Sequence, residues 1–96
     1  MTWMTNGEGR ARLRTAVGPL VVSTVECVER GDDGSFVIFS TGVKRNDEPQ
    51  HEGYVEVART SMEGCVGKIA AEENHERTVA IARVVVEKME KLWGRS

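Results

Sequence analysis

The stretch LVVSTVECVERGDDGSFVIFSTGVK, residues 20–44, decides the fold. Two runs rich in β-branched and aromatic residues, 20–29 and 36–44, flank a polar cluster. Asp33 and Gly34 in that cluster are residue types that tolerate a positive φ, as a tight turn between strands requires. The stretch therefore predicts an antiparallel β-hairpin.

The segment before the hairpin predicts a further strand. Residues 10–17 alternate between arginines and small or apolar side chains, and a period of two indicates a half-exposed strand. Gly18 and Pro19 end this strand. The residues before it, to about Glu8, are expected to be frayed.

The segment after the hairpin predicts a polar loop and one more strand. Residues 45–53 are polar and contain a proline. Residues 54–59 follow as a short strand, in which Val55 and Val57 are expected to face inward and Glu56 outward.

A long helix is predicted after the strands. Thr60 and Glu63 have the spacing of a capping box, no proline follows, and Gly94 can end the helix. The predicted fold class is α+β: an antiparallel sheet of three to four strands, with a β-hairpin core, followed by one long C-terminal helix packed on one face. We expect one α+β domain over 1–96, with 1–8 disordered.

The helix carries more apolar surface than a small sheet needs. From Ser61 to Trp93 it would be about 50 Å long, whereas strands of this length reach about 30 Å. A polar segment, 72–77, separates two apolar blocks, and in the second block Ile81, Val85 and Leu92 widen the stripe beyond one narrow seam. One prediction is a homodimer with two-fold symmetry, helix against helix. The alternative is a helix broken at Asn74, with all apolar residues buried within one chain. The residues expected at the contact are Val79, Val86, Met89, Leu92 and Trp93.

A histidine among carboxylates is the strongest candidate for chemistry. Glu72, His75 and Glu76 would share one helix face, and Glu-x-x-His is a spacing that helix bundles use for paired metal ions. Such a site needs two of these motifs, and the chain has one. We therefore expect a solvated helix face, with no metal, no cofactor and no catalytic residue. His51 and Glu52 lie in the polar loop and add no motif.

Composition excludes several classes of protein. The chain has 96 residues, of which 40% are hydrophobic and 29% charged, as in ordinary globular proteins. No apolar run approaches the ~18 residues of a membrane span, and the first residues lack the order of a signal peptide. Cys27 and Cys65 lack the spacing of a zinc site. A cytoplasmic, non-enzymatic protein that does not bind membranes is expected.

A competing prediction is weak nucleic-acid binding through Arg10, Arg12 and Arg14. A strand would project these side chains from one side at ~7 Å intervals, near the phosphate spacing of a duplex strand. The net charge of −2 opposes it, since binders of nucleic acid usually carry a basic excess. We expect a solubilising strand face instead.

Two patches resemble a large set of small uncharacterised proteins encoded by bacteriophages of actinobacteria. They are VSTV at 22–25 and RTSMEGCVGK at 59–68, where Thr60, Glu63 and Gly67 match the pattern. Lys68 stands where the set usually has histidine. The resemblance implies a phage accessory protein in the host cytoplasm and assigns no activity. The expected function is thus non-catalytic binding of protein: self-association through the helix and contact with a host or phage protein.

Overall fold

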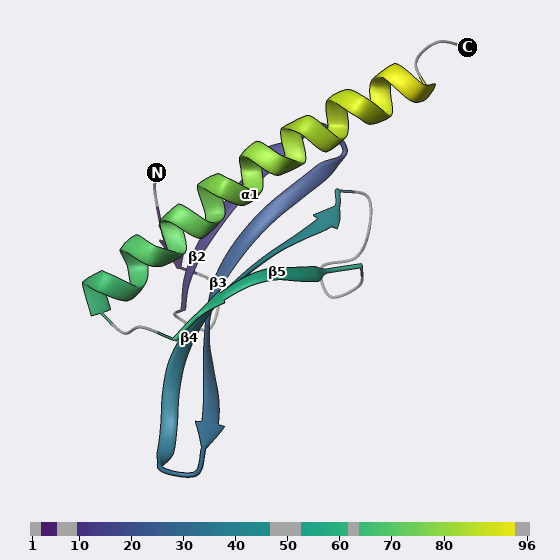
Figure 1. The fold of residues 1–96 in the computed structure, drawn as a ribbon. Coiled ribbons are helices and arrows are strands. Elements are labelled where there is room, and N and C mark those ends of the chain that lie inside the picture. Colours follow the sequence, from purple (N-terminus) through teal and green to yellow (C-terminus); the bar gives the residue numbers. More distant parts are fainter. Residues whose placement is uncertain (1–2, 6–9, 47–52, 62–63, 94–96) are drawn as a thin grey trace.

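The computed structural model describes residues 3–5, 10–46, 53–61 and 64–93. In these residues five strands precede one helix, and the strands form a single antiparallel sheet in which each pairs with its neighbour in sequence (Figure 1). The elements are β1 (Met4–Thr5), β2 (Ala11–Val17), β3 (Leu20–Gly31), β4 (Gly34–Arg45), β5 (Val55–Thr60) and α1 (Gly64–Trp93). The α+β class, with an antiparallel sheet followed by one helix, is confirmed; the sheet has five strands where three to four were predicted.

The additional strand is β1, at one edge of the sheet. Met4 pairs with Arg12 and Thr5 with Ala11, in a segment that was expected to be frayed. The side chain of Trp3 connects this segment to α1: its Nε1 donates a hydrogen bond to Glu72 Oε1 at 2.6 Å. The Trp3 ring also meets Phe39 edge to face, with centroids 5.6 Å apart. The sequence offers no local signal for such contacts.

Strands β3 and β4 form the long central hairpin. They pair in register from Leu20–Arg45 to Gly31–Gly34, so the turn is the two residues Asp32 and Asp33. Gly34 has φ +117°, a backbone conformation that residues with a Cβ rarely adopt. The far end of this hairpin projects beyond the helix (Figure 1), and the molecule measures 55 × 25 × 25 Å.

Helix α1 is continuous through Asn74 and lies diagonally across one face of the sheet (Figure 1). The alternative of a helix broken at Asn74 is therefore wrong, and the homodimer stays a prediction. The described helix spans Gly64–Trp93; the expected capping box includes Glu63, which lies outside the described residues together with Met62.

The core lies between this face and the helix. Antiparallel neighbours opposite each other point to the same side, which places Leu13, Val22 and Thr24 on the helix side of the sheet. One buried apolar cluster joins the strands to the second half of the helix; it consists of Val17, Val22, Val79, Ala82 and Val86, with Leu20 and Val43 packed against it.

Strand β5 departs from the prediction. Val55 and Val57, expected to face inward, are 64% and 58% exposed. The pairing of β4 with β5 shifts between Thr41 and Gly42, which form a β-bulge with the other strand. Val57 is the extra residue of β5 there and has no pairing partner in β4. Val55 lies opposite Val43 on the helix side of the sheet. It is exposed because β5 is an edge strand that the helix does not cover at this point.

Candidate interaction surface

The expected contact residues divide between core and surface. Val79 and Val86 are each 8% exposed and belong to the core cluster of their own chain. Met89 is half-buried, Leu92 is 74% exposed, and the side chain of Trp93 is outside the described residues. The structure therefore corrects the expected interface at Val79 and Val86: their 3–4 spacing is that of the stripe that packs on the sheet.

A second apolar stripe on α1 remains uncovered. We call it the apolar stripe; it consists of Ile81, Val84, Val85 and Leu92, which are 60%, 50%, 42% and 74% exposed. At about 100° per residue, these side chains lie on one side of the helix, turned away from Val79, Ala82 and Val86. The sequence did indicate excess apolar residues on the helix, since Ile81 and Val85 lie outside one narrow seam. It could not show which apolar residues pack on the sheet and which stay exposed, because the two stripes adjoin each other.

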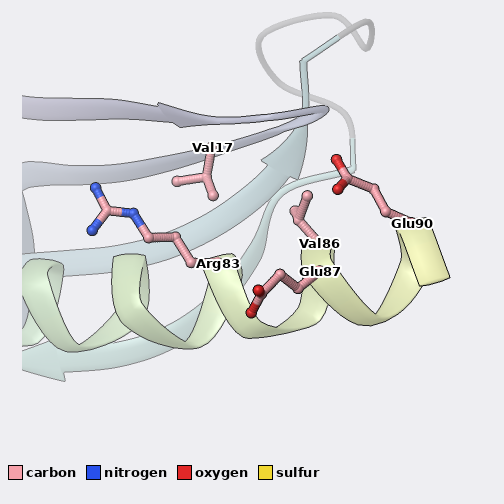
Figure 2. Close-up of a pocket in the computed structure, with 5 residues that line it drawn as sticks. All are labelled: Val17, Arg83, Val86, Glu87 and Glu90. Atoms are coloured by element: carbon pink, nitrogen blue, oxygen red, sulfur yellow. The ribbon is translucent and has the colours of Figure 1, made fainter.

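The flank of α1 on the other side of the core residues from the apolar stripe faces β2. Val86 of the helix and Val17 of β2 lie on the two sides of a shallow pocket of about 410 Å³, which Arg83, Glu87 and Glu90 also line (Figure 2). Since this polar flank borders β2, the far flank, with Ile81, points toward the β5 side.

Charges are segregated between the two flanks. The carboxylates Glu72, Glu76, Glu87 and Glu90 belong to the β2 flank or its border. Arg77 and Lys88 adjoin the apolar stripe, and Glu73 is the acidic residue nearest to them. All three are exposed. An apolar stripe with a charged border has the composition of a surface that meets another protein.

His75 is the largest departure from the sequence analysis. The predicted solvated face is wrong at this residue: the His75 side chain is completely buried against the sheet. Its Nε2 lies 2.8 Å from Thr15 Oγ1 and its Nδ1 2.9 Å from Thr24 Oγ1. Thr24 Oγ1 in turn lies 2.8 Å from Thr41 Oγ1.

The burial of His75 decides its chemistry. Burial lowers the pKa of the imidazole, although the charge of Glu76 acts in the opposite direction. The ring is therefore neutral near pH 7, with one nitrogen donating and the other accepting. No substrate can reach it, so we assign it to the joint between helix and sheet. The two glutamates that were expected to share a helix face with His75 do not contact its ring through a hydrogen bond. Glu76 is exposed, and Glu72 accepts the hydrogen bond from Trp3.

The arginine row lies on the opposite face of the sheet. Arg12 pairs with Val25 and Arg14 with Ser23, on the side away from α1. Arg14 is exposed, but Arg12 is half-buried, and its enclosed Nε has no hydrogen-bond partner among the residues that the structure describes. Arg10 precedes the strand and is half-buried. The three side chains thus do not form an evenly exposed row.

A polar cluster also occupies this face. The Ser40 hydroxyl donates to Glu56 Oε2 at 2.5 Å, and Arg59 Nε donates to Glu56 Oε1 at 3.1 Å. These two hydrogen bonds, Ser40 first, lower the pKa of Glu56. A carboxylate held in its ionised form is a poor general base, so it does not activate the serine. Burial raises the pKa of the neighbouring Tyr54 phenol.

The described residues contain neither a metal-ligand cluster nor a membrane-spanning helix. Within the described residues, no three His, Cys, Asp or Glu side chains converge as metal ligands would. The same part of the chain has no helix whose length and hydrophobicity would let it span a bilayer. Cys27 is half-buried with a free thiol, and burial raises its pKa. His51, Glu52 and the Cys65 side chain lie outside what the structure describes.

Comparison with family models, curated proteins and solved structures gave no match to this chain.

Proposed function

We propose that this protein is a non-catalytic binding module that acts through the apolar stripe of α1 and associates with a second copy of itself. The observation that carries the proposal is the exposure of four large aliphatic side chains in line on one helix. Single exposed apolar residues are ordinary on protein surfaces, but an aligned set with a charged border is typical of a binding surface.

The exposed aliphatic side chains of the stripe are in contact with water. Fully burying an exposed Val, Leu or Ile side chain is worth about 1.5–3 kcal/mol, so partly exposed members of the stripe leave several kcal/mol of possible stabilisation unused. A partner that covers them gains this free energy, less the cost of association.

The decisive experiment compares two isoleucines of α1. Ile81 in the stripe is 60% exposed, and Ile69 outside it is 57% exposed. The two lie about 120° apart around the helix. We expect Ile81→Glu to abolish self-association, because it places a charge in the contact, and Ile69→Glu to leave it intact.

The measurement is solution mass by light scattering on a sizing column, from about 10 to about 500 µM, a range suited to a micromolar dimer. The wild-type chain of 10.6 kDa should approach twice that mass as concentration rises. A wild-type mass that stays at 10.6 kDa throughout this range would refute self-association. Equal loss of mass in both variants would instead move the contact away from the stripe.

The alternative, nucleic-acid binding through Arg10, Arg12 and Arg14, remains a second proposal. Its one favourable observation is that Arg12 and Arg14 lie together on the face without the helix. Salt-dependent retention on heparin, lost when the three arginines are replaced by alanine, would support it. Absence of any mobility shift with DNA or RNA at low salt would refute it. A role as a phage accessory protein is the proposal that the resemblance suggests, and it is compatible with either activity.

A further inference from the structure

The apolar stripe can be matched against possible occupants residue by residue. Its members extend along α1 from Ile81 to Leu92, and the helix continues toward its beginning with Arg77, Glu73 and the small Ala70 on the same side. A helix lying along this surface would therefore need apolar side chains opposite some positions and small or charged ones opposite others.

We propose that the occupant is α1 of a second copy, running antiparallel, with Ile81 on the two-fold axis. This inference rests on the proposed function and specifies its geometry. In an antiparallel pair each residue faces the one equally far from Ile81 on the other side. Ile81 then packs on its own copy, Val85 faces the aliphatic stem of Arg77, and Leu92 faces Ala70, whose small side chain leaves room for it.

Charge complementarity fixes this register. Lys88 faces Asn74 of the second copy and lies beside its Glu73. Glu73 and Lys88 are exposed, and neither makes an ion pair within the described residues of its own chain. Sliding one helix by three residues would instead bring Lys88 against Arg77 and Leu92 against Glu73. That register opposes two like charges and buries a carboxylate against leucine.

The size of the surface sets the expected affinity. The exposed parts of the four stripe residues amount to roughly 400 Å² per copy, against about 800 Å² per partner in a standard interface. Neighbouring stems of Arg77 and Lys88 add to this. A contact at the low end of specific interfaces is expected to form a dimer with a dissociation constant in the micromolar range.

Charge reversal tests the register. Each pair occurs twice in a symmetric dimer, so Glu73→Lys or Lys88→Glu alone should raise the dissociation constant roughly fivefold to thirtyfold at low salt. The double variant restores the attraction with reversed signs and should recover most of the wild-type affinity. Both residues are exposed, so the variants keep the fold, which far-UV circular dichroism checks. If the wild-type protein dimerises and neither single reversal weakens the dimer, this register is wrong. It is also wrong if the losses of affinity in the two single variants add up in the double variant. Either result leaves the proposed function standing. A wild-type monomer would overturn the proposed function together with the register.

Cysteine cross-linking tests the orientation independently. In a background with Cys27 and Cys65 replaced by serine, Ile81→Cys should form a disulfide with its own copy, because both lie on the axis. Leu92→Cys should not, since antiparallel packing holds the two copies about 33 Å apart at 1.5 Å per residue. Efficient cross-linking at Leu92, which parallel helices would allow, would overturn the inference.

Discussion

Replacing His75 by leucine separates the two roles of this buried imidazole, hydrogen bonding and titration. The ring is completely buried and lies within hydrogen-bonding distance of Thr15 and Thr24. Leucine fills a similar volume but makes neither hydrogen bond. Thr24 and Thr41 still satisfy each other at 2.8 Å, so the main loss is two hydrogen bonds of about 0.5–1.5 kcal/mol each. We expect the free energy of unfolding at pH 7.5 to fall by about 1–3 kcal/mol.

The same substitution changes how stability depends on pH. Because burial lowers the pKa of His75 in the folded state, the unfolded chain takes up a proton first, at about pH 6.5. The contribution of the neutral ring is complete above that pH and is lost as the pH falls below it. Between pH 7.5 and 5.5 the wild-type protein should therefore lose up to about 1.4 kcal/mol more than His75→Leu does.

Urea unfolding followed by far-UV circular dichroism at the two pH values measures this difference. Carboxylates such as Glu56, whose pKa is lowered, also weaken the fold on acidification, but they are common to both proteins and cancel in the comparison. Identical pH dependence in the two proteins would refute the assignment of a buried neutral histidine. A wild-type protein that gains stability as the pH falls would refute it more strongly, because the imidazolium would then be favoured by folding.

Three further substitutions test the packing by urea unfolding. In Gly42→Ala the new Cβ would overlap Cζ of the Tyr54 ring, so about 1–3 kcal/mol of stability should be lost; an unchanged midpoint would show that the ring does not cover this glycine. Trp3→Phe keeps a ring but removes the 2.6 Å hydrogen bond to Glu72, and should cost about 0.5–1.5 kcal/mol; Trp3→Ala, which also removes the aromatic contact, must cost more for the reasoning to hold. Val86→Ala leaves a cavity in the core cluster and should cost about 1–3 kcal/mol; a cost below a few tenths would place this side chain at the surface instead.

The local elements could be predicted because their signals are local. Alternation in 11–17, the β-branched runs on either side of Asp32 and Asp33, and the absence of proline after 60 each depend on neighbours in sequence. The continuity of α1 through Asn74 was left open because the polar segment around it predicts solvent. In the structure His75 is buried there, and hydroxyl groups of two strands satisfy it.

The surface could not be predicted because it depends on where the helix lies on the sheet. Val86 and Val85 are adjacent valines, yet the first is buried in the core cluster and the second lies in the apolar stripe. Adjacent residues lie about 100° apart around the helix, so an error of that size in the helix orientation would place Val85 in the core and Val86 at the surface. The same reason makes Val86→Glu a poor test of binding, since it would put a charge into the core and unfold the chain.

The strand order has a consequence for biosynthesis. All five strands pair with sequence neighbours, so the sheet can assemble while α1 is still being translated. Residues 61–93 then take roughly two to seven seconds to add at 5–20 residues per second. During that interval the helix does not yet cover Val22 and Thr24, so this side of the sheet is exposed. Chaperone dependence of the soluble yield should therefore rise when translation through this segment is slowed.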